Sequence, residues 1–439
     1  SFRASFCLDF RPTRFQVDRV GLAEGSADRV TGGSAWHPAP DAVDSESSLT
    51  SVMWSTPLTK MVGTTQSPRP LEQSGAGETW YEWSKTRDAR TGRQVWRLTA
   101  APCTNEAPYF ESQGFTRDER FLVFASDRCG ALELFRVRME DGAITQLTDG
   151  GEFGKYGFNM HPDGQTCLYL TPNAIVLVDV AAGRERRRID LASRLPGRLM
   201  HFQPSVSADG DQLSLTVVDD HDDYHLLVYE FSLDRVTYLL TWPNGFSHPM
   251  ICPGDRDLMT FVPNGDACWQ MELPHHRRTR LWCVDVRDRR PRRFMTPPIN
   301  RTTTHESWSP DGQRMFFFEK TYPSWTPVAV RSVDRSGGDP RNHFVSGDLL
   351  LGHGVASRDG RFFVCDVQKP DDNPLLLIDL ETGEADTLCW PDSSIDGGHE
   401  AAAHVHPSLS PSGNYVAYTS DVTGHPQVYV APIDDLVQR

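Results

Sequence analysis

A turn followed by a strand-like run recurs seven times along the 439-residue chain. In each copy a polar turn containing Gly or Asp precedes an alternating or apolar run, which is the pattern of a β-hairpin. The copies are FTRDERFLVFAS (115–126), MHPDGQTCLYLT (160–171), VSADGDQLSLTV (206–217), ICPGDRDLMTFV (251–262), WSPDGQRMFFFE (308–319), ASRDGRFFVCDV (356–367) and LSPSGNYVAYTS (409–420). Their spacing of roughly 45 to 56 residues is typical of the blades of a β-propeller.

A second strand follows the hairpin in six copies and ends at an acidic or glycine-containing turn. The seventh copy has only QVYVAPID (427–434) after its hairpin, whereas KTRDARTGRQVWRLT (85–99) reads like the outer part of a blade. We therefore predict an all-β fold, a seven-bladed β-propeller in which residues 85–99 pair with residues 426–433 and close the ring. Closure leaves no exposed strand edge, and a pair of β-sandwiches would not explain seven equal units.

The chain divides into two parts by composition. Residues 1–78 are rich in Ser, Thr, Gly, Pro and Ala and have weak periodicity, so we expect an irregular or strap-like extension. The predicted propeller occupies residues 79–439.

Composition excludes some classes of partner and favours one compartment. The formal net charge of -15 argues against nucleic acid and anionic membranes as partners, and no apolar run approaches the roughly 20 residues that span a bilayer. The nine cysteines are dispersed without CxxC spacing, which favours mostly buried free thiols in a reducing compartment. With no signal-peptide pattern at the start, we expect a cytoplasmic protein. No pattern bears on the oligomeric state.

Histidines gather where the inner strand of each blade is expected to line the central channel, just ahead of the repeated turn. They are His201, His248, His305, His353, His404 and His406. A single histidine there can simply bond a neighbouring carbonyl, but six at matched positions favour a metal or acid–base site. His404 and His406 are two residues apart, which on a strand would place both rings on one face.

One arginine stands apart from the basic run around it. Eight arginines lie between residues 277 and 293, and most are expected on a solvated face of a hairpin. Arg280 differs because it opens the apolar strand RLWCV, in the blade just before that of His305.

Several segments of the chain resemble those of the oligogalacturonate lyases, the seven-bladed, pectin-degrading enzymes of polysaccharide lyase family 22. The resemblance covers about residues 80–439. It is carried by the segments DARTGRQVWRLT, ITQLTDG, GFSHPM, RLWCVDV, TTHESWSPDG, LGHGVASRDG and AHVHPSLSPSGNYVAYTSD.

The resemblance implies a role for each matched position. His305 matches the family's Brønsted base, and Arg280 matches its arginine. The family's metal is manganese, and its histidine ligands match His353, His404 and His406. A fourth ligand, a glutamine, matches Ala401, so we expect weaker metal binding unless His399, Glu400 or water takes that place. We further assign His201, His248 and Arg280 to substrate binding.

The chemistry explains why such residues are needed. A uronate lyase removes the weakly acidic proton next to a carboxylate and expels the glycosidic oxygen by β-elimination. Positive charge at the carboxylate stabilises the developing negative charge, and a neutral imidazole can take the proton near pH 7. An arginine fork can hold a carboxylate in two places.

We therefore predict a metal-assisted lyase that cleaves uronic-acid-containing oligosaccharides, most of all oligogalacturonate, to an unsaturated uronate product. One alternative is a related lyase for another linkage, such as rhamnose–glucuronate. Another is a non-catalytic, TolB-like interaction propeller, which would hold no metal. His248 is the main alternative to His305 as the base. Endo or exo action is not indicated.

Overall fold

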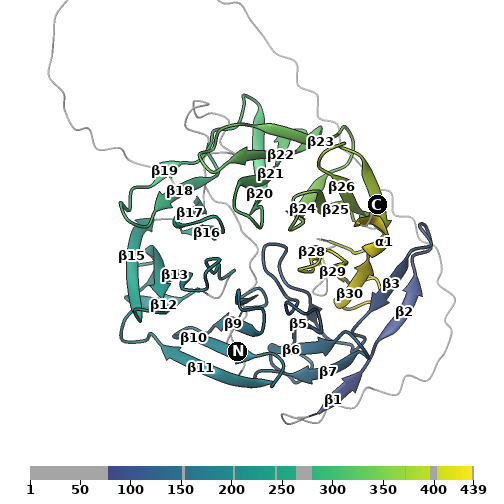
Figure 1. Cartoon of the computed structure of the whole chain (residues 1–439), viewed down its shortest axis with the longest axis horizontal. Coiled ribbons are helices and arrows are strands. Elements are labelled where there is room, and N and C mark those ends of the chain that lie inside the picture. Colours follow the sequence, from purple (N-terminus) through teal and green to yellow (C-terminus); the bar gives the residue numbers. More distant parts are fainter. Residues whose placement is uncertain are drawn as a thin grey trace, which may run out of the picture. The chain divides into compact units, whose positions relative to one another are not determined.

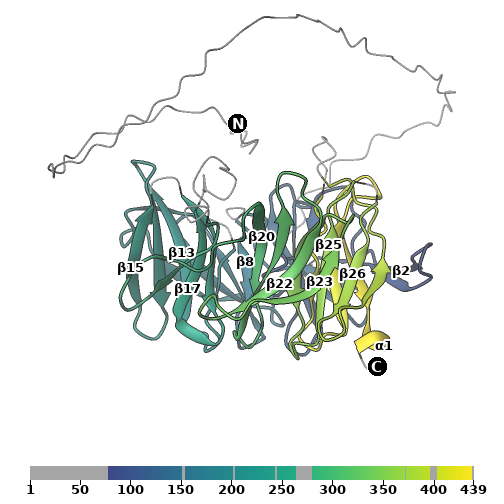
Figure 2. The same ribbon diagram turned by 90° about the horizontal axis from the view of Figure 1, so that it is seen from above.

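Seven antiparallel sheets surround a common centre in the computed structural model (Figure 1). The structure describes residues 78–150, 154–200, 203–242, 245–263, 279–370, 372–395 and 403–437. Figure 2 shows the same blades from the side, with strands running between the two faces of the ring. The predicted seven-bladed propeller is confirmed.

The first four blades follow one another along the chain, each listed here from its inner strand outward. Blade 1 contains β4 (Asn105–Glu106), β5 (Phe121–Ser126), β6 (Glu133–Arg138), β7 (Ala143–Gln146) and β1 (Thr79–Tyr81). Blade 2 contains β8 (Phe158–Met160), β9 (Thr166–Leu170), β10 (Ala174–Asp179) and β11 (Arg184–Asp190). Blade 3 contains β12 (Gly197–Leu199), β13 (Gln212–Asp219), β14 (Tyr224–Glu230) and β15 (Arg235–Trp242). Blade 4 contains β16 (Phe246–Cys252), β17 (Asp255–Pro263), β18 (Trp282–Asp285) and β19 (Arg292–Arg293).

The remaining three blades complete the ring. Blade 5 contains β20 (Arg301–Trp308), β21 (Arg314–Thr321), β22 (Val328–Asp334) and β23 (Arg341–Ser346). Blade 6 contains β24 (Leu351–Ala356), β25 (Phe362–Val367), β26 (Leu375–Asp379) and β27 (Ala385–Cys389). Blade 7 contains β28 (Ser408–Leu409), β29 (Tyr415–Ser420), β30 (Gln427–Pro432), β3 (Gln94–Arg97) and β2 (Ser84–Arg87), and helix α1 (Asp434–Val437) follows.

The ring closes by pairing strands from opposite ends of the described chain. In blade 7, Trp96 and Arg97 of β3 pair with Val430 and Tyr429 of β30, as the sequence predicted. Two blades also have a fifth strand, which the regular four-strand period did not predict. In these blades β1 adds to β7 and β2 adds to β3, so the strands before the first repeat cover two outer edges.

The apolar core lies between the blades. The described residues form seven clusters of buried side chains, and each cluster joins two neighbouring blades. Between blades 5 and 6, for example, the rings of Phe318 and Phe363 are both fully buried, with centroids 5.9 Å apart. Because the faces of each blade are buried against the neighbouring blades, the inner strands can carry polar side chains that line the channel.

The repeated turn has a common hydrogen-bond pattern. In blade 5 the Ser309 hydroxyl donates to Asp311 Oδ1 at 2.6 Å, and Asp311 accepts from the backbone of Gln313 at 2.9 Å. Gly312 has a φ of +65°, a conformation that favours glycine. The motif therefore fixes the link between the inner strand and the second strand of the blade.

Three other predictions concern the rest of the chain. The predicted extension, residues 1–78, lies outside the described residues except for Glu78 and stays a prediction. All seven cysteines in the described ranges are free, and five of them are buried, as expected. None of the helices formed by the described residues is long and apolar enough to cross a membrane.

Candidate metal and substrate site

Three consecutive blades carry an irregularity at the same place on their inner strands. The pairing register shifts across residues 247–250 in β16, 304–307 in β20 and 351–354 in β24. These intervals contain His248, His305 and His353. A β-bulge bends its strand and re-aims a side chain, so each imidazole departs from the regular alternation of the strand.

The matched position lies four residues before the Ser or Cys that begins each turn. It holds Gln203, His248, His305, His353 and His406 in blades 3 to 7. All of these except His353 have a positive φ, between 45° and 51°. Such backbone is uncommon outside glycine, and its strain is often retained at functional sites. Six histidines were predicted to occupy one matched position of the repeat, and four of them, His248, His305, His353 and His406, do so.

His404 and His406 differ from the expectation that both lie on a strand. They precede β28 in a segment without regular structure, and His406 has left-handed backbone with a φ of 45°. Their rings nevertheless lie side by side, with centroids 5.4 Å apart and planes inclined by 21°.

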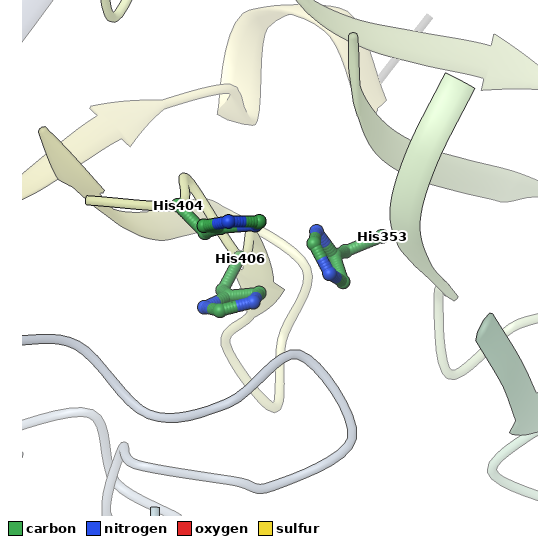
Figure 3. Close-up of side chains that lie close together, drawn as sticks. All are labelled: His353, His404 and His406. Carbon is green, nitrogen blue, oxygen red and sulfur yellow. The ribbon is translucent and has the colours of Figure 1, made fainter. Parts of the chain in front are cut away.

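A cluster of three imidazoles forms where blades 6 and 7 meet the channel. His353 faces His404 and His406 across a short gap (Figure 3), and one ligand atom from each residue lies within 4.8 Å of the other two. An ion about 2.0 to 2.3 Å from each nitrogen needs ligand atoms within about 4.6 Å of one another. Small side-chain rotations would therefore let all three share one ion.

The donor set fits a divalent metal that accepts nitrogen ligands. Asp366 Oδ2 accepts a hydrogen bond from His353 Nδ1 at 3.0 Å, which orients the ring and leaves Nε2 as the ligand atom. Burial lowers the pKa of His353, and it lowers the pKa of His406 well below the usual range, so both rings are neutral near pH 7. Neutral imidazoles are the form that binds a metal.

Aromatic residues of blades 1 and 2 pack against this cluster. The Tyr156 hydroxyl lies 3.2 Å from His406 Nδ1, and the Tyr109 ring centroid lies 4.6 Å from that of His406. Phe110 lies with its centroid 5.4 Å from that of His353. The segment around Tyr109 therefore brings an apolar wall against the imidazoles.

His305 adjoins the cluster without belonging to it. Its ring centroid lies 4.2 Å from that of His353, and its Nδ1 is buried with no hydrogen-bond partner among the described residues. Burial lowers the pKa of His305 well below its usual range, and nearby His353, Lys320 and Arg280 lower it further. His305 is thus a neutral imidazole able to accept a proton.

A buried carboxylate positions Arg280. The Nε atom of Arg280 donates to both carboxylate oxygens of Glu306, at 2.9 and 3.1 Å, and Glu306 is fully buried. Glu306 directly follows His305 in the bulge of β20, so the bulge fixes both side chains. Arg280 lies just before β18, which begins at Trp282.

His248 is held in a separate pair. Its Nδ1 lies 2.8 Å from Glu111 Oε1, and both side chains are about nine-tenths buried. The ring centroids of His248 and Tyr109 are 5.9 Å apart. His248 therefore faces the same channel from blade 4, with a carboxylate that orients it.

Arg280 and His305 line one pocket of about 340 Å³. Thr304, Lys320, Trp325, Leu350 and Gln368 complete its wall. Sequence reasoning missed Lys320, Glu306 and Asp366, because charged residues in strands are usually on the solvent face. The available signal was that Lys320 and Asp366 adjoin runs of apolar residues.

Four residues named from the sequence cannot be placed. His201, His399, Glu400 and Ala401 lie outside the described ranges, so their assigned roles stay predictions.

No model of a known protein family matches the chain. Two relatives are similar along most of its length. An oligogalacturonide lyase of Pectobacterium atrosepticum is 25% identical, and an oligogalacturonate lyase of Dickeya dadantii is 22% identical. Each similarity covers 80% of this chain and 96% of the relative.

Two solved structures share the fold. An oligogalacturonate lyase in complex with manganese has a TM-score of 0.73 at 22% identity, over 83% of this chain and all of that one. An oligogalacturonate lyase from Vibrio parahaemolyticus has a TM-score of 0.71 at 20% identity, over 82% of this chain and 99% of that one. The chain therefore resembles the oligogalacturonate lyases in sequence and in fold, as its motifs predicted.

Proposed function

We propose that the protein is a lyase that cleaves uronate oligosaccharides, oligogalacturonate above all, by β-elimination. The observation that carries the proposal is one juxtaposition in the channel. His305 is a neutral imidazole whose buried Nδ1 has no hydrogen-bond partner among the described residues. Its ring centroid lies 4.2 Å from that of His353, which belongs to the cluster of three histidines. Elimination next to a carboxylate requires a group that accepts the proton and positive charge that stabilises the carboxylate. His305 can be the acceptor, and Arg280 and a cation on the histidine cluster can supply the charge.

In this proposal His305 takes the proton from the sugar carbon next to the carboxylate. The electrons of that C–H bond form a carbon–carbon double bond, and the bond to the glycosidic oxygen breaks. The oxygen leaves with its electron pair and takes a proton from solvent. The product is an unsaturated uronate and a shortened chain.

Arg280 holds the carboxylate of the reacting sugar, and Glu306 holds Arg280. Among the described residues, His353, His404 and His406 would hold a divalent cation such as manganese. When bound, the cation would add positive charge at the carboxylate and so reduce the cost of the negative charge that develops there. His248, positioned by Glu111, binds the sugar from blade 4.

A substrate screen tests the proposal. The purified protein would be supplied with manganese and mixed with oligogalacturonate and with rhamnose–glucuronate oligosaccharides, and the ultraviolet absorbance of the unsaturated product followed. We expect product from oligogalacturonate and none from a His305→Asn variant prepared in the same way. Absence of absorbance with every uronate would overturn the proposal, and product from rhamnose–glucuronate alone would reassign the substrate.

A further inference from the structure

The pocket beside His305 contains a lysine that is almost fully buried. Lys320, on β21, is 3% exposed, and lysine is rarely buried to this degree without a partner. Its ammonium makes no ion pair with a carboxylate of the described residues. The carboxylates that act on it electrostatically are Asp366 and Glu306, and these are hydrogen-bonded to His353 and Arg280.

Among the described residues that line this pocket, Arg280 and Lys320 are the ionised side chains, and both are cationic. Burial lowers the pKa of Lys320 to about 8, so the ammonium is still mostly charged at pH 7. Burial is the main cause of this lowered pKa, so a bound anion that paired with the ammonium would offset part of the cost of burying it.

Two further polar groups around the pocket lack partners. Thr304 Oγ1 and His305 Nδ1 are buried, with no hydrogen bond to any residue in the described ranges. Buried polar groups are normally hydrogen-bonded, so an exception needs an explanation. A ligand with hydroxyl and carboxylate groups would satisfy Thr304, His305 and Lys320 together.

An aromatic ring forms part of the same wall. Trp325 has a φ of 66°, which is uncommon for a bulky residue, and its ring centroid lies 5.7 Å from Lys320 Nζ. A large aromatic surface beside a cation suits a sugar that carries a carboxylate, since the ring can pack on the apolar face of the pyranose.

We infer that Lys320 and Trp325 form a second uronate subsite, which binds the carboxylate and the ring of the sugar next to the reacting one. This inference rests on the proposed function, in which Arg280 holds the reacting carboxylate. Consecutive uronates, as in oligogalacturonate, supply one carboxylate to each cation. A chain in which uronate alternates with a neutral sugar leaves Lys320 unpaired, so Lys320 selects for the homopolymeric substrate.

Binding measurements test the subsite without turnover. In the His305→Asn protein, calorimetry would compare digalacturonate with a disaccharide of one galacturonate and one neutral sugar. Lys320→Met should weaken digalacturonate binding about 10- to 100-fold, as expected for a hydrogen bond to a charged group. Binding of the disaccharide with one neutral sugar should change less than about twofold.

Controls separate the subsite from general damage. Lys85→Met removes an exposed lysine of β2 and should leave both affinities unchanged. Trp325→Phe should retain more affinity than Trp325→Ala, and circular dichroism should show an unchanged fold in every variant. Equal losses for both disaccharides in Lys320→Met, or none for digalacturonate, would overturn the inference.

The outcome is distinguishable from failure of the proposed function. Binding that depends on Lys320, in a protein that forms no unsaturated product from any uronate, would keep the subsite and reject the lyase. Product formation with no selective effect of Lys320→Met would keep the lyase and reject the subsite. Failure of digalacturonate to bind when Lys320 is present would reject the subsite.

Discussion

Hydrogen bonds to buried carboxylates hold three of the side chains proposed to act in the channel, whereas the imidazole of His305 makes no such bond through Nδ1 among the described residues. Asp366 orients His353, Glu306 holds Arg280 and Glu111 holds His248. His305 Nδ1 has no such partner in the described part of the chain. This contrast at the level of single residues is the reason for assigning the proton transfer to His305.

His305→Asn should abolish turnover while leaving the fold and the metal content unchanged. Loss of a general base costs roughly 10²- to 10⁴-fold in rate, because the proton of the sugar carbon must then be taken by a weaker or more distant acceptor. Initial rates on oligogalacturonate, with metal content measured on the same samples, check this. His248→Ala is the comparison. If His305→Ala kept near-normal activity while His248→Ala was inactive, the base would be assigned to His248 instead.

Arg280→Lys should lower kcat/KM even though the positive charge is kept. An ammonium lacks the planar fork that holds Glu306 and a substrate carboxylate together, and a lost charge-assisted hydrogen bond costs about 10- to 100-fold. Kinetics of the two single variants and of the double variant with His305→Asn provide the check. The two effects should not multiply, since both act in one transition state. Multiplying effects would show that Arg280 acts elsewhere.

At the level of elements, the repeat predicted the blades and the closing strand. The regular period implies four strands per blade, so it could not reveal that β1 and β2 add fifth strands to two blades. Bulges in β16, β20 and β24 are also invisible to periodicity, since they are single-residue shifts of pairing. Sequence reasoning therefore found the channel histidines but not how their backbone is turned.

Charged partners of the site escaped prediction for a related reason. A carboxylate or ammonium within a strand is usually a solvated residue, yet Glu306 and Asp366 are fully buried and Lys320 nearly so. Only the fold shows that Glu306 and Asp366 pair with Arg280 and His353, and that Lys320 lines the pocket of His305. By contrast, the repeat drew attention to His353 and His406, and the resemblance to the oligogalacturonate lyases grouped them with His404 as ligands of one metal.

The closing strand should matter for the stability of the whole ring. Leu98, which follows β3, is 1% exposed and packs in the cluster between blades 7 and 1. Leu98→Ala should lower the free energy of unfolding by about 2 to 5 kcal/mol. Leu233→Ala is the matched control, because Leu233 is 58% exposed. Denaturant unfolding checks both, and equal stability of the two variants would mean that closure adds little.

At the scale of the whole molecule, a protein of net charge -15 is proposed to bind a polyanion. Local positive charge from Arg280, Lys320 and the cation site must outweigh the repulsion from the rest of the surface. Solvent ions screen the distant charges over about 8 Å at physiological salt, whereas the desolvated charges of the pocket act at contact. The pocket can therefore bind a polyanionic substrate even though the net charge of the protein is negative.

This arrangement predicts a basic limb in the pH profile. Burial lowers the pKa of Lys320 to about 8, so its charge is present below that pH and is lost as the pH rises through it. kcat/KM on digalacturonate should therefore fall above about pH 8, since this ratio reports the free enzyme. Lys320→Met should lack that limb, with metal content checked at each pH. The same limb in both proteins would assign it to another group.

The most direct test of the account asks whether the protein performs metal-assisted elimination. Trigalacturonate would be treated with protein freed of metal by chelation and with the same protein reloaded with manganese. Ultraviolet absorbance and product masses would then be measured on each sample. The account predicts an absorbing product in the reloaded sample only, with product masses that sum to the mass of the substrate. Products heavier in total by one water, or absorbance that is the same without metal, would contradict it.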